Sequence, residues 1–234
     1  MDVATQIVEW YKPDELVILG DFLDCTPVSH WLHDKRGQLE GLRLAEDFKK
    51  ANLLLTQLLT HTKRGFHFIE GNHEDWIKQA INRQPEYDGL INLELGLEFK
   101  RRAILSHHAY GGSFNIGKLW FTHGSYTNQY HAAKHVSAFE RSIIYGHTHD
   151  LQTYVKVSPL DVTDRHIAIS LGCLADKNPD YLRLRPNNWV HCVGVGLVRE
   201  NGTFNVDPII INNGIASYAG KTFRSSWSRR LRKS

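Results

Sequence analysis

Four short polar segments, each placed directly after an apolar run, constrain the fold of this 234-residue chain more than any other feature. The polar segments are Gly20–Asp24, Gly71–Glu74, His123–Gly124 and Gly146–His149, and the runs before them are Leu16–Leu19, Phe66–Ile69, Leu119–Phe121 and Ile143–Tyr145. Short apolar runs of this length predict buried strands. Open α/β sheets build their sites where strands end, so the four segments are candidates for one site.

Amphipathic patterns predict helices between these strands. One expected helix ends at Lys12-Pro13. Three others cover Leu42–Leu59, Asp75–Asn82 and Gln129–Phe139. Further strands are expected at Val155–Val157, Ile167–Leu171, Val190–Val198 and Phe204–Ile211. Residues 86–117 are less regular, and we interpret them as an insertion that borders the site. The predicted fold class is α/β.

The size and charge of the chain favour one catalytic domain with a basic tail. A chain of 26.9 kDa with 41% hydrophobic residues can bury one sizeable core, which we place in residues 1–220. The net charge of +3 hides an asymmetry, because residues 221–234 contain six basic side chains and no acidic one. We interpret residues 221–234 as a flexible basic tail.

The sequence indicates an unexported protein. The three cysteines lack CxxC spacing, which suggests neither a disulfide framework nor a thiolate zinc cluster. The first twenty residues do not form a signal peptide, and apolar runs stay well short of the ~18 residues that span a bilayer. We therefore expect a cytoplasmic protein without membrane partners.

The polar segments supply a carboxylate, an amide oxygen and several imidazoles. This mixed oxygen and nitrogen set suits Mn, Fe, Zn or Ni and is poor for Ca or Mg. Two-metal phosphoesterases hold their ions ~3.5–4 Å apart across a shared carboxylate, and Asp21 is the natural bridge. The expected cofactor is one or two divalent transition metal ions, with Mn favoured.

The order Gly-Asp-x-x-Asp, Gly-Asn-His-Glu, His-Gly and Gly-His-x-His resembles the calcineurin-like metallophosphoesterase superfamily. The resemblance covers roughly residues 14–175, and the loops look like those of phage and bacterial members. It implies layered sheets flanked by helices and a hydrolase that attacks phosphoesters with metal-activated water. A phage-encoded chain would work in the host cytoplasm.

The resemblance also assigns roles to individual residues. Asp21, Asn72, His123 and His147 would hold the second metal, and His149 would reach the first. If residues 147–149 are extended, the two histidine rings leave the same face and address adjacent ions.

Two further residues take supporting roles by resemblance. His73 matches the family histidine that protonates the leaving oxygen or contacts the phosphate, so general acid is its assigned role. Asp24 would be a second-shell carboxylate that orients a ligand. Taken singly, Asp21 and Asp24 would be turn or cap residues, but the joint pattern favours the site.

Other histidines are weaker candidates. His131 and His135 have the i, i+4 spacing of helical metal ligands, although we favour buried, hydrogen-bonded side chains. His30 and His33 follow the Asp24 loop and are candidates for lining the substrate cleft.

The chain departs from the superfamily in one motif. The family normally begins with a strand that ends in Asp-x-His, whereas Met1 here leads into the predicted helix, so the fold is expected to lack its first central strand. The chain is a truncated form, a one-metal variant, or a protein in which another segment replaces the lost ligands. The segment Asp164-Arg165-His166 also has an Asp-x-His sequence, but it precedes its strand, whereas the family motif ends one. We expect a dimer or a partner chain to cover the exposed sheet edge.

Three functions remain open at this point. A nuclease or phosphodiesterase acting on DNA or RNA is favoured slightly, because Phe223 and Trp227 lie among the basic residues of the tail. A solubilising tail is the alternative for this segment. The other functions are a phosphomonoesterase and a degenerate, non-catalytic scaffold with an incomplete first metal site.

Overall fold

The computed structural model describes residues 2–32, 34–179, 182–183 and 185–226 and has a mixed α/β fold. The chain divides into two compact units. Residues 8–112 form the N-terminal unit, and residues 1–7 with 113–234 form the C-terminal unit. Helix α1 (Asp2–Tyr11) contributes to both.

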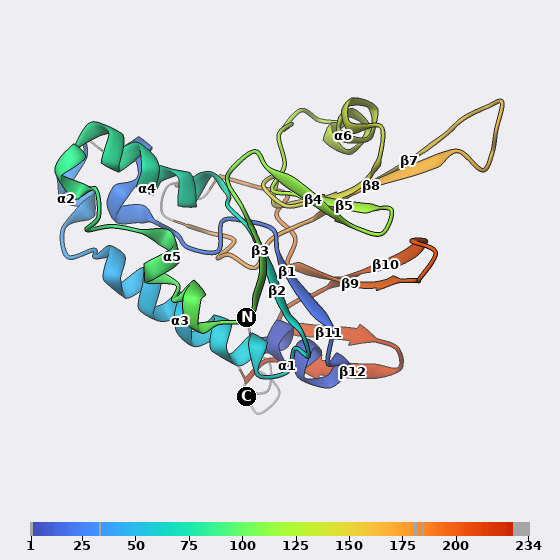
Figure 1. Ribbon diagram of the computed structural model, residues 1–234, viewed down its shortest axis with the longest axis horizontal. Helices are drawn as coiled ribbons and strands as arrows, with labels where there is room; N and C mark the ends of the chain where they lie inside the picture. Colours follow the sequence, from blue (N-terminus) through green and yellow to red (C-terminus); the bar gives the residue numbers. More distant parts are fainter. Residues whose placement is uncertain (1, 33, 180–181, 184, 227–234) are drawn as a thin grey trace. The chain divides into compact units, whose positions relative to one another are not determined.

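The N-terminal unit contains a three-stranded parallel sheet in the order β1-β2-β3 (Figure 1). Its elements are β1 (Glu15–Ile18), η1 (Thr26–Val28), η2 (His30–Leu32), α2 (Arg36–Leu39), α3 (Leu44–Leu59), β2 (Gly65–Ile69), α4 (Asn72–Arg83), η3 (Pro85–Tyr87), α5 (Leu93–Gly96), η4 (Phe99–Arg101) and β3 (Ile104–His108). Strand β1 is an edge of this sheet.

One face of this sheet carries the core of the N-terminal unit. Phe66 and Phe68 alternate along β2 and are fully buried against Leu55 of α3 and Trp76 of α4. Burying side chains of this size contributes roughly 1.5–3 kcal/mol each. The intervening residue His67 points to the other face, where its two ring nitrogens meet polar side chains of the neighbouring strands. This alternation holds the strand ends, and the polar segments after them, in fixed register.

The C-terminal unit is built on a five-stranded sheet in the order β4-β5-β6-β8-β7, parallel at its centre and antiparallel at both edges. Its elements are β4 (Ser113–Ile116), β5 (Leu119–Thr122), α6 (His131–Phe139), β6 (Ser142–Tyr145), β7 (Leu151–Val157), β8 (Arg165–Leu171), β9 (Cys192–Val198), β10 (Phe204–Ile210), β11 (Ile215–Tyr218) and β12 (Lys221–Arg224). Strands β9–β10 and β11–β12 form two separate hairpins.

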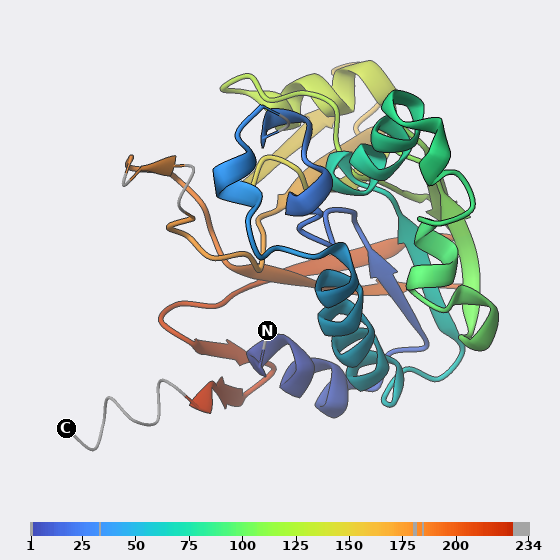
Figure 2. The same ribbon diagram turned by 90° about the vertical axis from the view of Figure 1, so that its left-hand side faces the viewer.

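Helix α6 packs on the five-stranded sheet. Ala132 and Val136 of the helix and Ile143 and Tyr145 of β6 form one buried cluster. The first residues of α1 lie beside the β11–β12 hairpin, as Figure 2 shows, because the Gln6 amide donates to the carbonyl of residue 224 at 2.9 Å.

Most of the predicted elements are confirmed, with ends that differ by a few residues. One difference matters for the site: α4 begins at Asn72, so residues 72–74 are the first helical turn and not a loop. The irregular stretch 86–117 contains β3, β4 and three short helices. In the parts of the chain that the structure describes, no helix is long and apolar enough to cross a membrane.

The basic tail does not start at Lys221. Residues 221–224 form β12, which pairs with β11, and Phe223 is 2% exposed. A buried ring cannot stack on a base, so the expected stacking role of Phe223 is wrong. Trp227 and the remaining tail residues, 227–234, lie outside the described residues.

Candidate functional site

The predicted ligands fall into two groups, one in each unit. Asp21 and Asn72 belong to the N-terminal unit together with His73, and they follow β1 and β2. His123, His147 and His149 belong to the C-terminal unit and follow β5 and β6. The strand ends therefore carry the polar segments, as the sequence predicted.

A buried carboxylate shapes the Asp21 loop. Glu74 is 1% exposed, and its two oxygens accept hydrogen bonds from four backbone amides. The donors are Asp21 at 2.9 Å, Phe22 at 2.8 Å, Leu23 at 2.9 Å and Gly71 at 2.7 Å. The bond to Gly71 caps α4, because a glutamate in the first turn reaches back to the residue before the helix. Hydrogen bonds to a charged acceptor are stronger than neutral ones, so Glu74 fixes the loop that carries Asp21.

The Asp21 loop and the start of α4 approach closely. A Cβ on Gly71 would lie 2.1 Å from Asp21 Oδ1 and 2.4 Å from the Asp21 amide, so only glycine fits there. The His73 amide donates to Asp21 Oδ1 at 3.0 Å, and His73 Nε2 lies 4.0 Å from Asp21 Oδ2. Two motifs that are distant in the sequence therefore meet at one carboxylate.

The imidazole of His73 packs on a neighbouring ring, and one of its nitrogens has no hydrogen-bond partner among the described residues. It stacks on Trp76 with ring centroids 4.3 Å apart and an interplanar angle of 22°. Its Nδ1 is buried and has no hydrogen-bond partner among the described residues. The ring sits on the first turn of α4, where the helix dipole favours negative charge such as a phosphate group.

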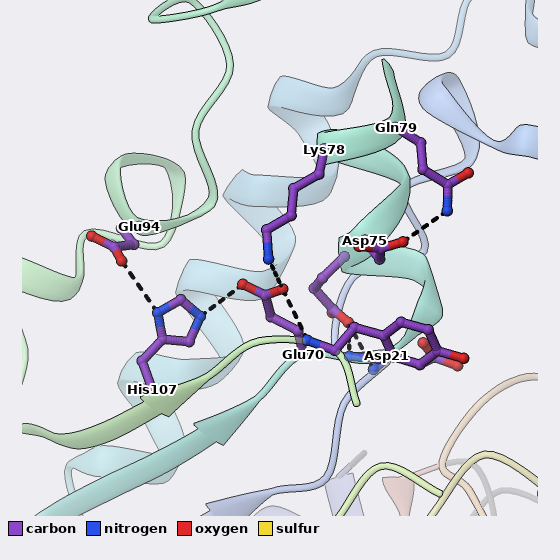
Figure 3. A network of polar contacts seen from close by, with 10 residues as sticks. Asp21, Glu70, Asp75, Lys78, Gln79, Glu94 and His107 are labelled. Atoms are coloured by element: carbon purple, nitrogen blue, oxygen red, sulfur yellow. Dashed lines mark hydrogen bonds and ion pairs between the residues drawn. The ribbon is translucent and has the colours of Figure 1, made fainter. Parts of the chain in front are cut away.

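A second buried carboxylate lies just before the Gly71–Glu74 segment (Figure 3). Glu70 is 2% exposed and pairs with Lys78 and with His107 Nε2, the latter at 2.9 Å. Burial alone would raise the pKa of Glu70, but hydrogen bonds from His107 and Lys78 hold that pKa below its usual value. The same bond to Glu70 raises the pKa of His107, which also contacts Glu94 at 3.2 Å. This network fixes the end of β2.

In the C-terminal unit, His123 and His147 come together. His123 is 1% exposed, and its Nε2 lies 3.1 Å from Nδ1 of His147. Two nitrogens bound to one ion at ~2.0–2.1 Å with tetrahedral angles are separated by about 3.3 Å. The two rings thus already have the separation that a shared metal requires.

The segment that carries His147 and His149 is not extended. Both residues have left-handed backbones, with φ of +66° and +63°, so the expected strand-like alternation of their rings is wrong. The chain turns here because the Gly146 amide donates to the His123 carbonyl at 2.9 Å and the Thr148 amide to the Gly146 carbonyl at 2.8 Å. The ring of His149 meets Trp189 edge to face at 4.2 Å.

A buried polar network stands behind this segment. His131 Nε2 lies 3.0 Å from Asp150 Oδ2, and His131 Nδ1 lies 2.6 Å from the Tyr145 hydroxyl. Both ring nitrogens of His135 make hydrogen bonds. Nδ1 donates to the His131 carbonyl at 2.7 Å, and Nε2 accepts from the Ser125 amide at 3.1 Å. Burial lowers the pKa of His135 to about 4. The interpretation of His131 and His135 as hydrogen-bonded core histidines is confirmed.

The remaining candidates contribute less. Asp24 is exposed and makes no hydrogen bond or ion pair within the described part of the chain, whereas Glu74 accepts the backbone amide of Asp21. His166 lies 3.4 Å from Asp164 at the start of β8. His30 is exposed, and His33 lies outside the described residues.

Sequence reasoning missed Glu74, Glu70 and Asp150. Glu74 was visible as the last residue of the Gly-Asn-His-Glu motif, and Asp150 directly follows Gly-His-Thr-His. Comparisons with protein-family models, curated proteins and solved structures found no match to the chain. Its function is therefore inferred from its residues and their geometry.

Proposed function

We propose that the chain is a metal-dependent phosphoesterase of the calcineurin-like type, which hydrolyses phosphoester bonds with metal-activated water. The observation that carries the proposal is that predicted site residues come together inside each unit. Asp21 receives the His73 amide at 3.0 Å in one unit, and His123 lies 3.1 Å from His147 in the other.

The donor set fits a divalent transition metal. We propose that Asp21, Asn72, His123 and His147 hold one ion, and that Asp21 and His149 contribute to a second. Carboxylate, amide and imidazole donors suit Mn first, with Fe, Zn or Ni as alternatives. When bound, such an ion lowers the pKa of its water and polarises the phosphoryl oxygens.

The proposed proton donor is His73. Its Nδ1 has no partner among the described residues, whereas His131 and His135 use both ring nitrogens. A histidine with spare hydrogen-bonding capacity next to Asp21 is suited to deliver a proton to the leaving oxygen. Stacking on Trp76 fixes the plane of the ring.

Hydrolysis of two model substrates tests the proposal. The intact chain with added Mn should hydrolyse bis-p-nitrophenyl phosphate, and Asp21→Asn and His147→Gln should each lower kcat/KM by at least roughly 100-fold. His166→Gln is the matched control, because the ring of His166 pairs with the exposed Asp164 and has no role in the proposed site, so the rate should be unchanged. Equal rates in all variants would overturn the proposal.

The same assay separates the alternatives. Hydrolysis of the diester alone favours a phosphodiesterase or nuclease, whereas preference for p-nitrophenyl phosphate favours a phosphomonoesterase. A non-catalytic scaffold that binds a metal ion is the second candidate. A metal-bound protein without hydrolysis of either substrate would support that candidate.

A further inference from the structure

Three parallel strands of the N-terminal sheet gather polar side chains on the face opposite the hydrophobic core. Glu15 lies on β1, His67 on β2, and Ser106 and His108 on β3, and the three strands lie side by side (Figure 1). His67 and Ser106 are register partners, so their side chains stand next to each other on one face. The proposed metal site uses none of these four residues, which leaves their arrangement to be explained.

Two hydrogen bonds connect the three strands. The Ser106 hydroxyl lies 2.7 Å from His67 Nδ1, and His67 Nε2 lies 3.0 Å from Oε2 of Glu15. The other oxygen of Glu15 pairs with the exposed Arg64. A hydroxyl within hydrogen-bond reach of an imidazole, whose second nitrogen meets a carboxylate, is the arrangement that activates a serine nucleophile.

An ionised carboxylate can only accept hydrogen bonds, which fixes the direction of this chain when His67 is neutral. His67 Nε2 then carries the ring proton toward Glu15, and Nδ1 accepts the proton of the Ser106 hydroxyl. The serine proton is therefore directed at the nitrogen that would remove it during an attack.

His108 supplies a hydrogen-bond donor at the same hydroxyl. Its Nε2 lies 2.8 Å from the Ser106 oxygen. Burial, with a contribution from His67 and His107, lowers the pKa of His108, so this ring is neutral at about pH 8. The single hydroxyl proton is directed at His67, so His108 Nε2 donates to the serine oxygen. An N–H group in this position can stabilise negative charge that develops next to the serine.

Solvent reaches this hydroxyl. Ser106 is half-buried, and the side chains of His67 and Glu15 expose 12% and 17% of their surface. Hydrogen bonds on both sides of His67 hold its ring in one orientation. A hydroxyl that is only partly exposed admits a small molecule more readily than a bulky one, so the reactant that fits is small.

We propose that Ser106 is a nucleophile that accepts the acyl group of small carboxylic esters, with His67 as its base. Ser106 Oγ attacks the carbonyl carbon while its proton passes to His67 Nδ1. The bond between that carbon and the leaving oxygen then breaks, and His67 returns the proton to the leaving alcohol. Water repeats the two steps on the acyl-serine, which releases a carboxylic acid and regenerates Ser106. This activity needs no metal ion and is separate from the proposed phosphoester hydrolysis.

Labelling of the full chain with methanesulfonyl fluoride in EDTA at about pH 8 tests the inference. This small reagent sulfonylates an activated serine, because the serine oxygen displaces fluoride from sulfur, and mass spectrometry locates the adduct. The adduct should form on Ser106 of the folded chain. His67→Gln should slow labelling at least roughly 100-fold, because the base is lost. Ser113→Ala is the matched control, since Ser113 is a half-buried serine on β4, and this variant should be labelled on Ser106 at the unchanged rate.

Glu15 acts through His67, so it is a positioning residue and needs a separate measurement. Glu15→Gln removes the negative charge that stabilises the imidazolium. The pH midpoint of the labelling rate should therefore move to lower pH, which a purely structural role of Glu15 would not cause. An unchanged midpoint would contradict the role of Glu15 in this chain of hydrogen bonds.

Several results would overturn the inference. They are the absence of an adduct on Ser106 of the folded chain, equal labelling rates in His67→Gln and the unchanged chain, and equal labelling of the chain unfolded in urea. Hydrolysis of p-nitrophenyl acetate separates the inference from the proposed function. Release of p-nitrophenolate in EDTA that is lost in Ser106→Ala supports the inference, whereas ester hydrolysis that requires Mn would contradict it, because the activity would then belong to the proposed metal site.

Discussion

The two groups of proposed ligands are supported in different ways. In the N-terminal unit, one carboxylate, Glu74, accepts four backbone amides and thereby sets the loop of Asp21. In the C-terminal unit, support for His147 and His149 is spread over hydroxyls, imidazoles and carbonyls that each make one or two bonds. Where one residue makes most of the supporting hydrogen bonds, its substitution should lower stability strongly. Where the bonds are spread over several residues, each single substitution should lower stability only a little.

Glu74→Ala should give the largest effect. It leaves four backbone amides without their acceptor, and we expect a loss of about 3–5 kcal/mol in unfolding free energy. Mn affinity should fall as well, because Asp21 loses its fixed position. Urea unfolding and calorimetric Mn titration measure the two effects. A loss under 1 kcal/mol would show that the support is not concentrated in Glu74.

Gly71→Ala tests the close approach of the two motifs. The new Cβ would meet Asp21 Oδ1 at 2.1 Å, so the loop must move at a cost of about 2–4 kcal/mol. Gly37→Ala in α2 is the matched control, since nothing lies within 4 Å of its Cβ. Thermal unfolding of both variants gives the comparison, and equal midpoints would contradict the tight contact.

Tyr145→Phe tests one hydrogen bond of the polar network in the C-terminal unit. It removes one hydrogen bond, to His131 Nδ1 at 2.6 Å, and we expect a loss of about 1–2 kcal/mol. Mn affinity should change less than in Glu74→Ala, because Thr148 keeps its 2.8 Å contact with Ser170. If Tyr145→Phe abolished metal binding, the contrast between the two groups would fail.

The pH dependence of stability tests a buried histidine of the C-terminal unit. Burial lowers the pKa of His135 to about 4, below its ordinary value of 6.5. The unfolded chain therefore binds the proton first, so His135 costs stability as the pH falls from about 6.5 to 4. His135→Gln should reduce the slope of stability against pH in that window by up to about 1.4 kcal/mol per pH unit. Unfolding at several pH values checks this, and an unchanged slope would contradict it.

The sequence predicted those parts of the site that depend on local pattern. Apolar runs located β1, β2, β5 and β6, and the polar residues after them named Asp21 and His123. The backbone of His147 could not be predicted, because its positive φ depends on hydrogen bonds made after folding. The role of Glu74 was hidden for the same reason, since three of its four donors lie more than fifty residues away in the chain.

Calorimetric titration of Mn into the full chain tests the central claim most directly, using Asp21→Asn, His147→Gln and the double variant. The unchanged chain should bind Mn, and each single substitution should weaken binding at least roughly tenfold. The double variant should bind more weakly than either single variant, because it removes two proposed ligands and not one. Undiminished binding in both single variants, or no binding by the unchanged chain, would contradict the account.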